Sequence, residues 1–97
     1  MSLRPSFKAA FQKAFDKLTQ EKRDLVLKTL EALASYFQTG QAPYGLRIKK
    51  LYAGSLGKTF EARASADLRL VWVQTHEEIV FCLVGNHDEV QKFLKNL

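Results

Sequence analysis

The spacing of hydrophobic residues changes once along this chain of 97 residues, and that change limits the folds open to it. In roughly the first 40 residues, apolar side chains recur every three to four positions, which is typical of helices that bury one face. From Lys58 the period becomes two, which is typical of strands with one buried and one polar face. The order predicts an α+β fold in which helices come first and pack on a small, mainly antiparallel, twisted sheet.

Two amphipathic helices are expected before the sheet. The first is expected over about residues 6–18, with Ser6 as its N-cap. The second is expected to begin at Thr19 or Gln20 and to end at Gly40, a residue suited to a helix C-terminus. Because the turn between them is short, the two helices are predicted to form an antiparallel hairpin.

The strands are expected to follow in a meander. They are predicted at 58–65, 68–73 and 79–84, with a mixed signal at 46–51 and turns bracketed by Gly54 and Gly57 and at 75–78. An odd turn over 65–67 would give one apolar face: Phe60, Ala62, Leu68, Leu70 and Trp72. That register sets Arg63 nearly opposite Arg69, so a carboxylate or anion is needed nearby; Glu61 and Asp67 are candidates. A two-residue turn would mix the two faces.

Positive charge concentrates in the middle of the chain. Residues 44–73 contain six Lys/Arg against two Asp/Glu, and the basic residues are Arg47, Lys49, Lys50, Lys58, Arg63 and Arg69. A cluster of this kind can bind phosphates or an acidic protein segment. On charge alone, a merely solvated basic face is an equally good interpretation.

A histidine lies where the last strand gives way to a short C-terminal helix. Asn86 as N-cap and Glu89 at the third helical position form a capping-box pattern, which puts His87 at the first helical position. A neutral histidine beside two arginines is what a general base for RNA cleavage requires. The alternative is that His87 is a capping or surface histidine. His76, in the turn over 75–78, is expected to be a plain surface residue.

Other function classes find little support in the sequence. The length suits one domain over residues 1–97. No stretch has the ~20 apolar residues of a membrane helix and no signal peptide is evident, so a cytoplasmic protein is expected. The single cysteine, Cys82, lies in a strand and is expected to be a buried thiol. No metal-ligand spacing is present, and neither a metal nor another cofactor is expected.

The segments "GLRIKKLYAGSLGKTFEARASADLRLVW" and "VGNHDEV", after two amphipathic helices, resemble the RelE/ParE superfamily of toxin-antitoxin toxins. Within it the similarity is closest to RelE-like and YafQ-like mRNA endoribonucleases. The resemblance covers nearly the whole chain and implies a RelE/ParE-like fold, with residues 2–5 as a first strand. It also implies ribosome-dependent cleavage of mRNA through attack of a ribose 2′-hydroxyl on the adjacent phosphate.

The resemblance assigns roles to individual residues. His87 corresponds to an acid/base histidine, Arg63 to a polar catalytic or RNA-contacting position, Asp67 to an acidic site residue and Arg69 to a phosphate-binding arginine. RNA contacts are expected from Arg47, Lys49, Lys50, Lys58 and Glu61. The chain departs from the pattern in lacking a C-terminal tyrosine and in having Gln91 where YafQ-like members have an aromatic residue.

Two further readings stay open. A ParE-like gyrase inhibitor has the same fold but needs no acid/base histidine. A catalytically inactive member would use its basic groove only to bind an acidic protein. In each case the resemblance implies a cognate antitoxin as partner, wrapping the toxin with a helix and an extended segment. For the endoribonuclease, the ribosome and mRNA are further partners, and no membrane is involved.

Overall fold

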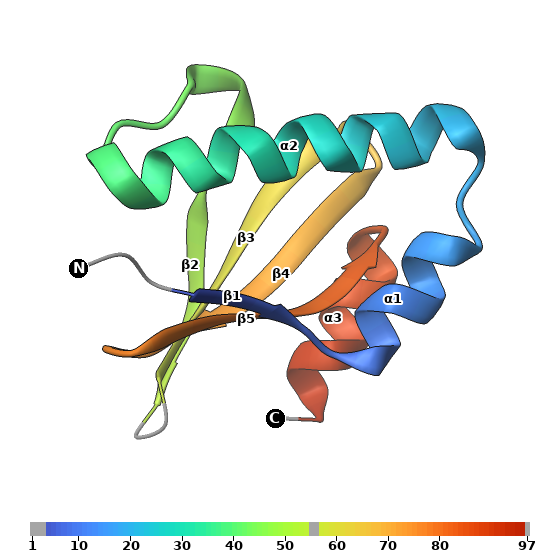
Figure 1. Ribbon diagram of the computed structural model, residues 1–97. Coiled ribbons are helices and arrows are strands. Elements are labelled where there is room, and N and C mark those ends of the chain that lie inside the picture. The colour runs from blue at the N-terminus through green and yellow to red at the C-terminus, as the bar shows by residue number, and fades with distance from the viewer. Residues whose placement is uncertain (1–3, 55–56, 97) are drawn as a thin grey trace.

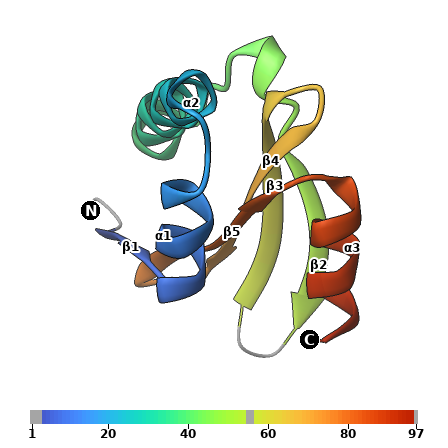
Figure 2. The same ribbon diagram turned by 90° about the vertical axis from the view of Figure 1, so that its right-hand side faces the viewer.

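The computed structural model describes residues 4–54 and 57–96, and its centre is a five-stranded sheet in the order β1-β5-β4-β3-β2. The elements are β1 (Arg4–Phe7), α1 (Ala9–Asp16), α2 (Gln20–Thr39), the 3-10 helix η1 (Tyr44–Leu46), β2 (Lys49–Gly54), β3 (Gly57–Ser65), β4 (Leu68–Gln74), β5 (Glu78–Gly85) and α3 (His87–Lys95). β1 runs parallel to β5, and the other neighbours are antiparallel. Helices α1 and α2 lie on one face and α3 on the other (Figures 1 and 2). The expected α+β class and mainly antiparallel sheet are confirmed.

The start of the first helix was predicted wrongly. Ser6 belongs to β1 and caps nothing, while α1 begins at Ala9. The backbone of β1 pairs with β5 up to Phe7, whose ring stacks on that of Phe81 with centroids 5.1 Å apart. Pro5 fits this position because an edge strand tolerates a residue without an N–H group. The strand implied at 2–5 is therefore present but shifted, and its residues 2 and 3 lie outside the described residues.

The second helix matches its prediction at both ends. Thr19 is the N-cap, and its Oγ1 accepts a hydrogen bond of 3.3 Å from the Lys22 amide. Gly40 ends the helix in the left-handed conformation, with φ of 77°, which a glycine adopts without steric cost. In the structure α1 packs chiefly on β5 and α2 on β3. The two helices cross at a large angle (Figures 1 and 2), so the prediction that they lie antiparallel is wrong, because each helix packs on its own strand of the sheet.

The core lies between the sheet and these two helices, with Trp72 of β4 at its centre. Trp72 is fully buried, and its ring lies 5.6–5.8 Å from those of Phe37, Phe60 and Phe81. The cluster joins α2 with three neighbouring strands. The predicted apolar face is confirmed, since Ala62, Leu68, Leu70 and Trp72 belong to the buried core and Phe60 packs against it.

The register between β3 and β4 also matches the prediction, but the turn that produces it does not. Arg63 pairs with Arg69. The turn has two residues, Ala66 and Asp67, and the register shifts between Arg63 and Ser65. A β-bulge of this kind adds one residue to one strand, and it restores the alternation that we expected from a longer turn. The Ser65 hydroxyl closes the turn by donating to Asp67 Oδ1 at 2.9 Å.

The chain enters the far edge of the sheet through an unusual backbone conformation. Arg47, between η1 and β2, has φ of 47°, a left-handed value that non-glycine residues seldom adopt. The mixed signal at 46–51 thus corresponds to a 3-10 turn followed by an edge strand. Gly54 pairs with Gly57, so the two glycines do bracket a turn, of which residues 55 and 56 lie outside the described residues.

Within residues 4–54 and 57–96, no helix combines the length and apolar character needed to cross a membrane.

We expect Trp72→Ala to lower the free energy of unfolding by about 3–5 kcal/mol, because it removes a large aromatic side chain from a fully packed core. Leu27→Ala is the matched control, since Leu27 is 49% exposed and its loss should cost about 0.5 kcal/mol or less. Urea unfolding followed by circular dichroism measures both. Equal losses for the two variants would contradict the assignment of the core.

Burial raises the pKa of the Cys82 thiol, and its Sγ donates to the Val80 carbonyl at 3.4 Å. Since the thiolate is the reactive form, we expect alkylation of the folded protein at pH 8.5 to be much slower than alkylation in 8 M urea. Iodoacetamide labelling followed by mass spectrometry tests this. Similar rates in the two conditions would mean that Cys82 is accessible.

Candidate active site

Two charged residues project from the sheet face opposite α1 and α2. Side chains alternate along a strand. Ala62 and Leu70 point into the core, so their neighbours Arg63 and Arg69 point to the opposite side of the sheet. Glu61 lies on this same side, and we call the face that carries Glu61, Arg63 and Arg69 the site face. Helix α3 covers part of it (Figure 2).

The pairing of β4 with β5 brings the start of α3 to Arg69. Gly85, the last residue of β5, pairs with Arg69. The chain then turns into α3 through the predicted capping box, in which the Glu89 amide donates to Asn86 Oδ1 at 2.9 Å and the Asn86 amide donates to Glu89 Oε1 at 3.0 Å. A Cβ at Gly85 would lie 2.9 Å from Glu89 Oε1. A glycine here therefore permits the cap that fixes His87 at the first helical position.

Arg69 and His87 contact each other directly. Arg69 Nη1 lies 2.7 Å from His87 Nδ1. A guanidinium group has only donors, so Nδ1 must be the acceptor, and the neutral ring carries its proton on Nε2. We call these two residues the arginine–histidine pair.

Glu61 supplies the negative charge behind this pair. Its Oε1 lies 3.9 Å from Arg69 Nη1, and the residue is only 5% exposed. This is one of the two carboxylates expected to offset the repulsion between Arg63 and Arg69, and Lys49 of β2 pairs opposite it. The side chain of Arg69 is itself 13% exposed, and its buried Nε has no hydrogen-bond partner among the described residues.

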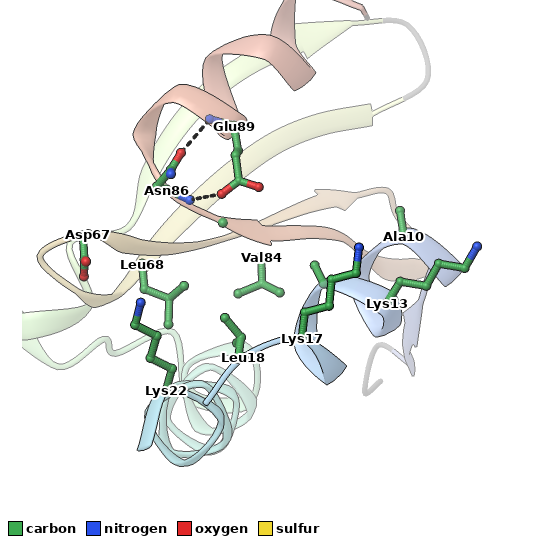
Figure 3. A pocket seen from close by; sticks show the side chains of 12 residues that line it. Ala10, Lys13, Lys17, Leu18, Lys22, Asp67, Leu68, Val84, Asn86 and Glu89 are labelled. Carbon is green, nitrogen blue, oxygen red and sulfur yellow. Dashed lines mark hydrogen bonds between the residues drawn. The ribbon is translucent and has the colours of Figure 1, made fainter. Parts of the chain in front are cut away.

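Asp67 lies elsewhere. It occupies the β3–β4 turn and lines a cavity of about 470 Å³ on the side of α1 and α2, which Figure 3 shows and which we call the end pocket. Its Oδ1 accepts the hydrogen bond from Ser65, and among the described residues no hydrogen bond or ion pair joins Asp67 to Arg69 or His87. The structure thus separates Asp67 from the arginine–histidine pair.

The basic residues expected to bind RNA divide between the two faces of the sheet. Lys49 pairs with Glu61 and belongs to the site face. Lys50 pairs with Phe60, and Lys58 lies two residues before Phe60, so both belong to the opposite face. The RNA-binding roles of these residues, and those of Arg47 and Glu61, stay predictions.

Sequence reasoning missed one residue of the site face. It assigned nothing to Tyr52, which pairs with Thr59 on the site face and is 53% exposed. The available signal for Tyr52 was weak, because a register shift between Lys50 and Tyr52 breaks the alternation of β2.

The arrangement suits proton transfer beside an anion. A fixed cation stabilises negative charge that develops on a phosphate, and a neutral imidazole accepts a proton. Among the described residues, no group of three His, Cys, Asp or Glu side chains is placed to hold a metal ion.

No known family profile and no curated protein matches this sequence. Solved structures do. Escherichia coli YafQ in its complex with DinJ has a TM-score of 0.69 and 16% identity, covering 93% of this chain and 98% of that one. The YoeB dimer from Staphylococcus aureus has a TM-score of 0.67 and 21% identity, covering 90% of this chain and 99% of that one. RelE of the RelE–RelB complex from Pyrococcus horikoshii has a TM-score of 0.66 and 16% identity, covering 89% of this chain and 96% of that one. The chain has the fold of RelE-like toxins.

The contact between Glu61 and Arg69 predicts a non-additive pair of substitutions. Glu61→Gln should lower the free energy of unfolding by about 1–3 kcal/mol, because it leaves a largely buried guanidinium without its carboxylate. Arg69→Met should lower the free energy of unfolding less in the Glu61→Gln protein than in the wild type, because in the double variant no buried charge is left without its partner.

Glu77→Gln, in the exposed β4–β5 turn, is the control with the same chemical change. Urea unfolding is measured for the wild type, the two single variants, the double variant and this control. The difference between the double variant and the sum of the single variants is the coupling free energy between Glu61 and Arg69. Strict additivity of the two substitutions would show that Glu61 does not stabilise Arg69.

Proposed function

We propose that this protein is the toxin of a toxin-antitoxin system and that it inhibits translation by cleaving mRNA on the ribosome. The observation that carries the proposal is the 2.7 Å contact between Arg69 Nη1 and His87 Nδ1 where α3 begins beside the site face. A phosphate-binding cation and a proton acceptor in contact are the two groups that cleavage by a 2′-hydroxyl needs first.

The fold supports the same proposal. YafQ, YoeB and RelE share it over nearly their whole length, and the YafQ and RelE structures are complexes with the antitoxins DinJ and RelB. By analogy, the partners of this chain are a cognate antitoxin and, during cleavage, the ribosome and its mRNA. The reaction takes place in the cytoplasm and uses no cofactor.

The first step is an exchange of partners at Arg69. In the free protein, Arg69 occupies the lone pair of His87 Nδ1, so the imidazole cannot act as a base. The scissile phosphate binds the guanidinium instead, because a charge-assisted bond to an oxyanion is stronger than one to a neutral ring nitrogen. This releases Nδ1 next to the ribose whose 2′-hydroxyl is to react.

The second step is the transfer itself. His87 Nδ1 takes the 2′-hydroxyl proton while the bond from O2′ to phosphorus forms and the bond from phosphorus to O5′ breaks. The proton held by the imidazole is then delivered to O5′, which gives a 2′,3′-cyclic phosphate and a free 5′-hydroxyl. Arg69 neutralises the extra negative charge on the phosphorane. An imidazolium formed beside a bare guanidinium would be repelled, so the bound phosphate is a condition for proton uptake.

Glu61 and Arg63 have supporting roles in this scheme. Glu61 orients Arg69 from behind, and its burial keeps it away from the anionic substrate. Arg63, opposite Arg69 in the register, contacts the neighbouring phosphate.

We expect His87→Ala to lower the rate of mRNA cleavage at least about 100-fold, since it removes the proton acceptor. Arg69→Ala should have a similar effect, and Arg69→Lys should recover only part of the activity because an ammonium group lacks the two-pronged donor geometry. The measurement is primer extension on a translated message after induction of each variant in cells.

His76→Ala is the control, because His76 is exposed in the β4–β5 turn. Translation-dependent cuts that persist at wild-type level in a folded His87→Ala protein would remove His87 from the mechanism. Growth arrest without any cuts would favour inhibition of gyrase, and the absence of arrest would favour an inactive protein-binding module.

A further inference from the structure

The end pocket is built from parts of the chain that the site face does not use. It lies between the α1–α2 corner and the ends of β4 and β5 (Figure 3). Leu18, Leu68 and Val84 form an apolar floor. Its volume of about 470 Å³ is in the range of pockets that hold small organic ligands.

The rim of the end pocket is positively charged. Lys17, the C-cap of α1, and Lys22 of α2 flank the apolar floor, while Lys13 of α1 lines the pocket with its ammonium group pointing away from that floor (Figure 3). None of the three ammonium groups makes a hydrogen bond or ion pair with the described residues. The two carboxylates of the lining are already engaged, since Asp67 accepts from Ser65 and Glu89 accepts from the Asn86 amide. These hydrogen bonds come from neutral donors and leave both carboxylate charges in place, so the lining carries three ammonium groups against two carboxylates and has a small net positive charge.

The end pocket is separated from the arginine–histidine pair only by the end of the sheet. Asn86 lines the pocket, and the next residue is His87. Leu68 and Gly85 also line it, and they are the chain neighbour and the cross-strand partner of Arg69. The pocket and the arginine–histidine pair therefore lie on opposite faces of the same end of the sheet.

We propose that the end pocket binds a nucleotide of single-stranded RNA next to the scissile phosphate, with the base on the apolar floor and its phosphates at Lys17 and Lys22. This proposal rests on the proposed function. A base is a flat apolar body with polar edges, and the pocket offers an apolar floor ringed by polar groups. The outer oxygen of Asp67 is available to accept from an exocyclic amino group, as carboxylates do with cytosine. Asp67 then acts in reading the sequence next to the cut.

An acidic peptide segment would also complement three lysines. The RNA is favoured because the pocket adjoins the proposed cleavage site and because its floor matches a base. A protein occupant is therefore one outcome of the test.

The test compares Lys17→Gln/Lys22→Gln with the control Lys28→Gln/Lys92→Gln, which removes the same charge from exposed positions outside the pocket. Both are added to a translating extract with a defined message, and cut sites are quantified at increasing toxin concentration. Loss of two phosphate contacts should raise the half-saturating concentration roughly tenfold near 0.15 M salt and flatten its salt dependence. The maximal rate should stay near that of the wild type, and the nucleotide preference next to the cut should weaken.

The outcomes separate this proposal from the one on which it rests. If the wild-type protein makes no cuts, both proposals fall. If it cuts and the pocket variant behaves as the control does, the end pocket is not an RNA subsite and the proposed function stands. If cutting is unchanged but the antitoxin no longer neutralises the pocket variant, the pocket is a protein-binding site and the nucleotide proposal is wrong.

Discussion

The structure depends on one aromatic contact set, the packing of Trp72 against rings from α2, β3 and β5. β4 has neighbours on both sides, and the middle of a sheet is the place where a large ring can be covered completely. Through this cluster α2 is held against β3, β4 and β5. Because side chains alternate along β4, burying Trp72 on this face places Arg69 on the opposite one.

The same strand that buries Trp72 presents Arg69 on its other side. A central strand gives a guanidinium little contact with water, so the protein surrounds it with a buried carboxylate, Glu61, and a ring nitrogen of His87. These partners fix the orientation of the arginine before any ligand is present. The Nε donor of Arg69 is buried without a hydrogen-bond partner among the described residues, which is an energetic cost of placing an arginine on a central strand.

Local patterns predicted the parts of this arrangement that depend on local chemistry. The cap of α2, the capping box before His87 and the two faces of β3 and β4 could be read from spacing and residue type. β1 could not, because Phe7 continues the helical stripe and only its pairing with Phe81 makes it a strand. The placement of Asp67 depends equally on tertiary structure, since a turn residue can face either side of a sheet. The lysines of the end pocket come from two helices whose angle no local pattern encodes.

The bulge at Ala64 has a consequence for how such a protein can vary during evolution. It supplies the single extra residue that keeps β3 and β4 in phase across a two-residue turn. Loss of one residue here would reverse β4 relative to β3, turning Arg69 toward the helices and Trp72 outward. A deletion at this hairpin should therefore survive in evolution only when an insertion nearby restores the register.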